Sequence, residues 1–170
     1  MSDVTKMEVH QEEEDTQEGK FLTFILGREV YGLEIRYVTE IIGIQKVTPV
    51  PDMPDYVRGV INLRGKVIPV MDVRLRFGME AREYDERTCI VVIEASETIV
   101  GLIVDTVQEV LEIPAEQIEE THQMRRGHGN QFMQGLGKVG ENVKILLNAE
   151  SLLFKDAEHL QSVSPENVDE

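Results

Sequence analysis

The chain has 170 residues, with 32 acidic residues against 17 lysines and arginines, and a formal net charge of -15. This length suits one ordinary domain or two very small ones, and excludes a catalytic domain joined to a regulatory one. The acidic balance argues against nucleic-acid binding, which needs a clustered basic surface. No apolar run is long enough to insert in a membrane and the N-terminus lacks signal-peptide features, so we expect a cytoplasmic protein.

The negative charge is concentrated at the two ends of the chain. Residues 1–20 hold seven acids against two lysines, and residues 156–170 hold five acids and no base. Both ends are poor in large apolar residues, which is typical of disorder. The sequence therefore predicts acidic tails at 1–19 and 156–170 around a folded part at 20–155. Its single cysteine, Cys89, excludes an internal disulfide, and its apolar neighbours predict a buried, inert thiol.

The folded part is expected to begin with a β-hairpin. Residues 21–26 and 30–35 are rich in apolar and β-branched side chains, and Gly27 and Arg28 supply the turn between them. The apolar residues from Ile35 to Ile42 then follow spacings of three, three and one, which predicts one or two helical turns. After these turns, three prolines within residues 49–54 predict an edge segment or connecting loop.

The central stretch, residues 57–77, reads VRGVINLRGKVIPVMDVRLRF and predicts a second hairpin. Asn62 and Gly65 can satisfy the turn, because these residue types tolerate positive φ. Arg64 is not needed for the turn, and its planar guanidinium suits recognition of a partner's carboxylate or carbonyl. The alternative is an ordinary surface arginine beside a turn.

The sequence after residues 78–87, which we interpret as a linker, resembles the sequence before it. A first alignment of the chain with itself matches glycine, glutamate and apolar positions together, placing Gly32, Leu33, Ile35, Val38, Glu40, Ile41, Ile42 and Ile44 on Gly101, Leu102, Val104, Val107, Glu109, Val110, Leu111 and Ile113. A second alignment, with a slightly larger shift, brings Val67, Val70 and Asp72 to Val143, Leu146 and Asn148. This internal duplication predicts two subdomains, at 20–80 and 85–150.

Units of this size are marginal alone, so the two copies should share one hydrophobic core and leave a groove between them. Their short strands favour small closed or nearly closed barrels, and a short helix should end the domain at 148–154. The predicted fold is all-β with short helices. Glu40 and Arg64 are expected to border the groove, where a few charges could fix the register of a bound partner.

No motif predicts catalysis, a cofactor or a metal. Gly135, Gly137 and Gly140 form a G-x-G-x-x-G pattern, but a strand rather than a helix follows it, which favours a hairpin turn over a phosphate loop. The alternative interpretation, a nucleotide-dependent enzyme, is supported by this pattern alone. The four histidines have no metal-ligand spacing, and His128 lies in a loop of mobile composition. We therefore expect a protein that is not an enzyme and holds no cofactor.

Several motifs resemble those of one family. The run VRGVINLRGKVIPVMDVR at 57–74, YGLEI at 31–35, VTEI at 38–41, VGLIVDTV at 100–107 and GLGKV at 135–139 are similar to the CheW-type chemotaxis coupling proteins. The resemblance runs in order from residue 20 to residue 154. It implies two five-stranded SH3-like barrels packed around a shared hydrophobic core.

The resemblance also implies a function. CheW-type proteins are non-catalytic scaffolds of two-component signal transduction, which couple chemoreceptor cytoplasmic tips to the histidine kinase CheA. By motif match, the receptor-binding residues would be Val38, Glu40, Gly59, Asn62, Arg64 and Gly65. The regulatory domain of CheA would contact a barrel end, around Val110. The protein would be cytoplasmic and recruited to receptor arrays at the inner face of the membrane, with ring assemblies formed with the kinase or with itself.

Two alternatives remain at this point. The chain could be a detached regulatory module of a chemotaxis kinase, since that domain is itself CheW-like. It could also be a small-barrel nucleic-acid binder, which would need exposed aromatic residues on a basic face. The absence of tryptophan and the acidic core argue against the second alternative.

Overall fold

The structure is a computed structural model, and it describes residues 17–120 and 130–155. Most of these residues lie in strands, which confirms the all-β prediction: β1 (Lys20–Leu26), β2 (Glu29–Glu34), β3 (Val38–Gly43), β4 (Val57–Leu63), β5 (Lys66–Asp72), β6 (Cys89–Ala95), β7 (Thr98–Val104), β8 (Thr106–Glu112), β9 (Ile118–Glu120), β10 (Met133–Val139) and β11 (Asn142–Leu147). The helical segments are short: η1 (Ile35–Tyr37), α2 (Val73–Arg76), η2 (Ala115–Gln117), η3 (Asn130–Phe132) and α3 (Ala149–Phe154). Both predicted hairpins and the terminal helix are confirmed. None of the helices in this part of the chain is long and apolar enough to cross a bilayer.

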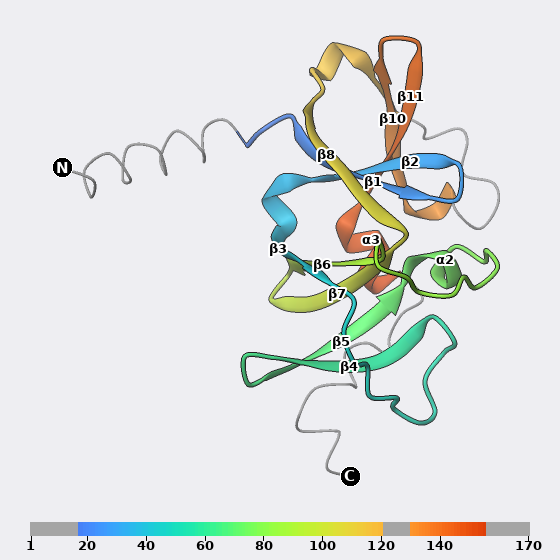
Figure 1. Cartoon of the computed structure of the whole chain (residues 1–170). Helices are drawn as coiled ribbons and strands as arrows, with labels where there is room; N and C mark the ends of the chain where they lie inside the picture. The colour runs from blue at the N-terminus through green and yellow to red at the C-terminus, as the bar shows by residue number, and fades with distance from the viewer. Residues whose placement is uncertain (1–16, 121–129, 156–170) are drawn as a thin grey trace.

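The strands form two sheets, which lie one above the other in Figure 1. The six-stranded sheet has the order β8-β1-β2-β11-β10-β9, and the five-stranded sheet has the order β3-β6-β7-β5-β4. Two pairings are parallel, β2 with β11 and β5 with β7. Within residues 17–120 and 130–155 neither sheet closes on itself, so the predicted barrels are not confirmed.

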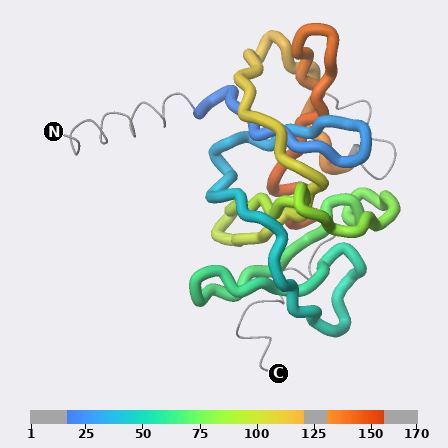
Figure 2. The backbone as a smooth tube through the Cα atoms, viewed as in Figure 1, coloured from blue at the N-terminus to red at the C-terminus, as the bar shows by residue number. Residues whose placement is uncertain are grey.

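The predicted duplication is visible in the strand order. The run β1, β2, β3, β4, β5, α2 matches the run β6, β7, β8, β10, β11, α3, and the strands after the first two of each copy lie in the sheet that contains the first two strands of the other copy. The six-stranded sheet combines β1 and β2 of the first copy with β8, β9, β10 and β11 of the second, and the five-stranded sheet combines β6 and β7 of the second copy with β3, β4 and β5 of the first. Figure 2 follows the backbone between the sheets at residues 35–37.

Irregularities in the ladders repeat as well. An extra residue bulges from β3 at Thr39 and from β8 at Gln108, which the first alignment of the two copies places on each other. Another bulges from β4 at Arg58 and from β10 at Gln134, which the second alignment places on each other. Because a bulge bends its strand and strengthens the local twist, matching bulges give the two sheets matching curvature.

The prediction of one or two helical turns between Ile35 and Ile42 is wrong. Only Ile35–Tyr37 forms a 3-10 turn, and Val38–Gly43 is a strand whose residues alternate between half-buried and exposed. The apolar spacing here spans a crossing from one sheet to the other rather than one helical face. The hydrogen bonds that make β3 a strand come from β6, about 50 residues away in sequence.

The core has three parts. The central cluster takes residues from both sheets, among them Leu22, Phe24 and Leu102, which confirms the predicted shared core. A second cluster, with Ile61 and Val70, belongs to the five-stranded sheet, and a third, around Phe21, Ile113 and Leu146, belongs to the six-stranded sheet. Each sheet therefore curves around a small cluster of its own and buries its other face against its neighbour.

Candidate functional site

An ion pair joins the two edges of the five-stranded sheet. Glu40 lies on β3 at one edge, and Arg64 lies in the turn after β4 at the other. Arg64 Nη2 donates a hydrogen bond to Glu40 Oε1, and this contact raises the pKa of the guanidinium above its ordinary value. The Arg64 side chain stays 71% exposed and that of Glu40 29% exposed, so the pair faces solvent. The sheet is thus curved enough for its first and last strands to meet through side chains.

Arg64 has a positive φ, which is an unfavourable backbone conformation for a residue other than glycine or asparagine. Its φ is 50° and that of Gly65 is 86°, the pattern of a two-residue hairpin turn in which both central residues have positive φ. The sequence suggested Asn62 for this role, but Asn62 remains in β4 and its Oδ1 accepts a 2.9 Å hydrogen bond from the Gly65 amide. Asparagine or glycine would fit the first turn position better. Strain retained at an exposed charged residue is a reason to suspect a function there.

A shallow pocket opens beside the ion pair. The side chains of Ile68, Val92 and Ile99 give it apolar walls, and Lys66 and Glu94 add charges. All of its lining residues come from β3, the β4–β5 hairpin, β6 and β7, so the pocket belongs to the five-stranded sheet. The sequence instead predicted that Glu40 and Arg64 border a groove between the two units. The arrangement can hold an elongated partner with apolar side chains and a charged or carbonyl group for Arg64.

Two further residues of the predicted receptor surface face inward. Val38 is half-buried and packs against the central core. Gly59 is buried, and a Cβ atom built on it would lie 2.0 Å from the Thr48 carbonyl oxygen. Thr48 and Val60 exchange backbone hydrogen bonds of 2.8 and 2.9 Å at this point. The structure therefore brings Glu40, Asn62, Arg64 and Gly65 to one surface and places Gly59 behind it.

Val110 lies on the other sheet. It is on β8, opposite Leu22 of β1, and is 51% exposed. The exposed large apolar residues of the described chain form two pairs that the alignments of the two copies make equivalent, Ile41 with Val110 and Val67 with Val143. Each sheet therefore presents two exposed apolar side chains at matching positions.

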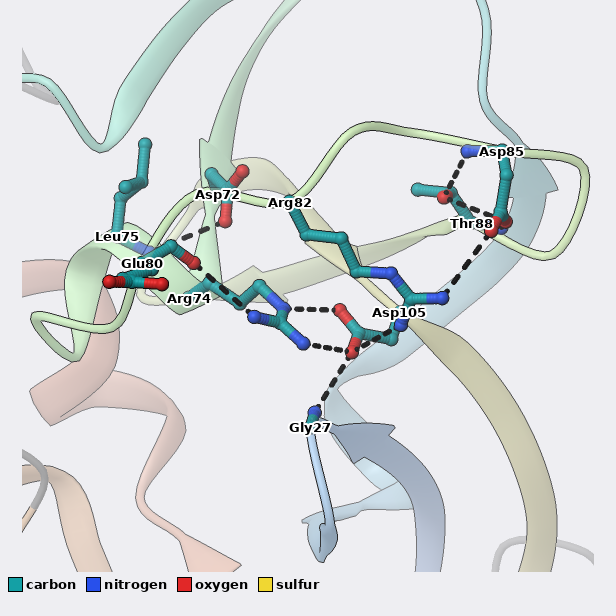
Figure 3. Close-up of polar contacts among 9 residues, drawn as sticks. All are labelled: Gly27, Asp72, Arg74, Leu75, Glu80, Arg82, Asp85, Thr88 and Asp105. Atoms are coloured by element: carbon teal, nitrogen blue, oxygen red, sulfur yellow. Dashed lines mark hydrogen bonds and ion pairs between the residues drawn. The ribbon is translucent and has the colours of Figure 1, made fainter.

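A charged cluster that was not predicted from the sequence surrounds Asp105, between β7 and β8 (Figure 3). Arg74 Nε and Nη2 donate to the two carboxylate oxygens at 2.7 and 2.6 Å, and Arg82 Nη1 and the Gly27 amide each donate at 2.9 Å. Burial raises the pKa of this carboxyl, but the Arg74, Gly27 and Arg82 donors outweigh burial and hold it below its ordinary value. In the sequence, the feature that could have pointed to this cluster was one acidic residue, Asp105, inside the apolar run at 100–107.

The segment at 78–87, predicted as a linker, contains no helix or strand but is tied to the core. Besides the Arg82 contact, the Tyr84 hydroxyl donates a 2.6 Å hydrogen bond to Asp72 Oδ2. Burial and the neighbouring Asp72 carboxylate raise the pKa of Tyr84 far above its ordinary value. The segment is therefore fixed to residues at the ends of β5 and β7.

The glycine pattern is a hairpin, as predicted. Gly135 and Gly137 lie in β10, and Gly140, with φ of 61°, turns the chain into β11. No group of three or more His, Cys, Asp or Glu residues could hold a metal ion in the described ranges. The loop around His128 lies outside the described residues.

Two curved sheets of duplicated sequence, with exposed charged and apolar residues, define a β-rich interaction module. Comparison with known proteins assigns the module to a family. The family model of the CheW-like domain matches residues 20–157, and the chain belongs to this family.

Similar proteins include the chemotaxis protein CheW of Klebsiella aerogenes, 39% identical over 137 residues that cover 81% of this chain and 82% of that protein. Chemotaxis protein CheW of Helicobacter pylori is 33% identical, with 85% and 87% covered. The crystal structure of the scaffolding protein TtCheW from Thermoanaerobacter tengcongensis matches with a TM-score of 0.76 at 33% identity, covering 82% of this chain and 95% of that one. The family is one of non-catalytic scaffolds, and the chain is a chemotaxis coupling adaptor between receptors and CheA.

Proposed function

We propose that the chemoreceptor cytoplasmic tip binds at the Glu40–Arg64 surface. The observation that carries this proposal is an exposed arginine held in a strained turn, paired with a glutamate from the opposite edge of the same sheet. The strain has no structural use, because a smaller residue would make the turn more easily. In this position the guanidinium can exchange Glu40 for a carboxylate or carbonyl of a receptor helix, whose apolar side chains enter the adjoining pocket.

The remaining residues of the receptor surface support the turn. Asn62 fixes the Gly65 amide, Gly59 lets residue 48 dock against β4, and Val38 anchors β3 just before Glu40. Substitutions at Val38 and Gly59 would therefore weaken receptor binding by displacing the strands rather than by removing a contact.

The CheA regulatory domain binds the six-stranded sheet around Val110. Exposed apolar residues at equivalent positions of both sheets give the molecule two similar but distinct ends. Two unlike ends of one module allow head-to-tail contacts, which close into a ring when the rotation permits. Such contacts fit rings formed with the CheW-like regulatory domain or with further copies of this chain. Receptor binding would recruit the cytoplasmic protein to arrays at the inner face of the membrane.

Calorimetric titration tests the receptor surface. We expect Arg64→Glu to weaken binding of a chemoreceptor cytoplasmic fragment by about tenfold or more, since the new carboxylate repels both Glu40 and an acidic partner. Binding of the CheA regulatory domain should stay unchanged. Arg36→Glu is the matched control, because Arg36 is also exposed and also paired with a glutamate. Unchanged receptor affinity in folded Arg64→Glu would refute the assignment.

The same titrations test the kinase surface. Val110→Glu should weaken binding of the CheA regulatory domain by about tenfold, because it places a charge in an apolar contact. Gln108→Glu introduces the same charge at a neighbouring exposed position of β8 and should have little effect. Equal effects of the two substitutions would show that net charge, and not an apolar contact at Val110, decides kinase binding.

A further inference from the structure

The Asp105 cluster lies where the chain passes from the five-stranded sheet to the six-stranded sheet. β7 ends at Val104 in the first sheet, and β8 begins at Thr106 in the second. Asp105 is the residue between them, and its side chain is 6% exposed. A buried carboxylate must be matched by donors, and here the donors come from separate parts of the fold.

The donors of Asp105 connect both sheets and the segment between the two copies (Figure 3). Gly27 belongs to the β1–β2 turn of the six-stranded sheet, Arg74 belongs to α2 directly after β5 of the five-stranded sheet, and Arg82 belongs to the segment at 78–87. Arg74 also donates to the Glu80 carbonyl oxygen at 3.3 Å, which ties the start of that segment to the same point. One carboxylate therefore binds the β1–β2 turn, 78 positions away in sequence, and two consecutive segments, α2 and residues 78–87.

The equivalent crossing in the first copy has only an exposed counterpart of this cluster. The first alignment of the two copies places Arg36 on Asp105, and Arg36 lies in η1 between β2 and β3. Arg36 is 63% exposed, pairs at 2.5 Å with Glu34 and lies over the ring of its neighbour Tyr37. Glu150 of α3 is near enough to raise the pKa of Arg36, and it accepts a 3.4 Å hydrogen bond from Ser96 in the β6–β7 turn, but these contacts are exposed. The two crossings thus have the same place in the fold, but a buried ion pair ties only the second.

The cluster also lies on the path between the two proposed binding surfaces. The Arg64 turn continues into β5, which ends at Asp72 two residues before Arg74. Asp105 precedes β8, which carries Val110. The Arg74–Asp105 pair therefore joins the helix that follows the strand from the receptor surface to the residue that precedes the strand to the kinase surface.

We propose that Asp105 is a clamp that fixes the two sheets relative to each other and so sets the angle between the receptor and kinase surfaces. The part of this inference that concerns the two surfaces rests on the proposed function. The clamp itself does not, because its donors and its exposure define it without any partner.

Distance measurement between spin labels tests the clamp without partners. Labels would be attached at Val67→Cys and Val143→Cys, exposed equivalent positions on the two sheets, in a Cys89→Ser background of the full chain. In Asp105→Asn, which keeps the side-chain shape and removes the charge, we expect the width of the distance distribution to roughly double. Arg36→Gln at the equivalent crossing is the control and should leave the width unchanged. An unchanged width in folded Asp105→Asn would overturn the proposal.

Arg82→Gln decides the question if Asp105→Asn does not fold. Arg82 is 48% exposed and its loss leaves the Arg74 pair in place, so this variant is expected to fold. It should broaden the distance distribution to a smaller extent and raise amide hydrogen exchange in residues 78–88 by about tenfold. If neither the distance distribution nor the hydrogen exchange changes in Arg82→Gln, the proposal of a clamp is overturned.

Titration of both partners tests the consequence for function. In the wild-type chain, a saturating receptor fragment should change the affinity for the CheA regulatory domain by about fivefold or more. In Asp105→Asn each partner alone should bind within about twofold of wild type, and the linkage should be lost. Linkage retained in Asp105→Asn, or absent from the wild type, would overturn the role of the clamp. If the wild type binds neither partner, the proposed function fails, while the label distances still judge the clamp.

Discussion

Arg64 is one of a few residues whose backbone conformation conflicts with its side chain. Ser96 and Glu97 are two others, with φ of 49° and 64° in the β6–β7 turn. In the first copy, Gly27 takes the position equivalent to Ser96, with φ of 63°. An L-residue in this region costs about 1–2 kcal/mol, and glycine avoids that cost while adding entropy to the unfolded chain.

Glycine at position 64 or 97 should therefore relieve strain in both turns, but should reduce receptor binding only at position 64. Glu97→Gly should raise the free energy of unfolding by about 0.5–1 kcal/mol, measured by urea denaturation. Arg64→Gly should also leave the fold at least as stable, because its exposed ion pair contributes little, yet it should lose receptor affinity. A loss of stability in Glu97→Gly would mean that its turn is not strained.

Gly59 gives the opposite prediction. Gly59→Ala should lower the free energy of unfolding by about 2–3 kcal/mol, because its Cβ would overlap the Thr48 carbonyl oxygen and its φ is 141°. Gly43→Ala is the control, since no atom lies within 4 Å of a Cβ built there. Similar unfolding midpoints for the two variants would contradict the close approach at Gly59.

At the scale of elements, α2 and α3 have equivalent positions in the two copies, but their N-cap residues make different contacts. Asp72 caps α2 by accepting from the Leu75 amide at 3.3 Å, and Asn148 caps α3 by accepting from the Ser151 amide at 2.9 Å. The second alignment of the two copies places one cap on the other. Only Asp72 also accepts a hydrogen bond from Tyr84, so it fixes the segment at 78–87 as well as a helix.

The caps should therefore differ in their contribution to stability. Asn148→Ala should cost about 1 kcal/mol and Asp72→Ala about 2–3 kcal/mol in urea denaturation, since the second change also leaves a half-buried hydroxyl without its acceptor. In a Tyr84→Phe background the effect of Asp72→Ala should fall toward that of Asn148→Ala. Equal effects in both backgrounds would remove Asp72 from the anchoring of this segment.

For the whole molecule, the contact between the sheets should depend on acid pH. The pKa of Asp105 is lower in the folded chain than in the unfolded chain, where an aspartate has a pKa of about 3.9. Below that pH the unfolded chain takes up a proton that the folded chain resists, so the stability from Asp105 is present above about pH 4 and is lost as pH falls further. Urea midpoints at pH 5 and pH 3 should therefore differ less in Asp105→Asn than in the wild-type chain. An equal difference in both chains would show that Asp105 does not contribute to acid unfolding.

Local patterns in the sequence were sufficient for the two hairpins, the last helix, the interpretation of the glycine pattern and the family. Each depends on residues close together in the chain: alternating apolar side chains, a turn residue or an N-cap. The duplication was also readable, because it repeats whole motifs. Arg64 could be singled out as unnecessary for its turn, although not as the residue with positive φ.

Only the tertiary structure decided the exchange of strands between the two copies, the place of the Glu40–Arg64 pair on one sheet, and the Asp105 cluster. In each case the interacting groups are far apart in sequence. Arg74 and Asp105 are 31 positions apart, and Gly27 and Asp105 are 78 positions apart. A strand becomes a strand through a partner ladder, and a buried carboxylate becomes stable through its donors. Local periodicity determines which side chains can be buried, but the partners that they meet are determined by how the whole chain closes its two sheets.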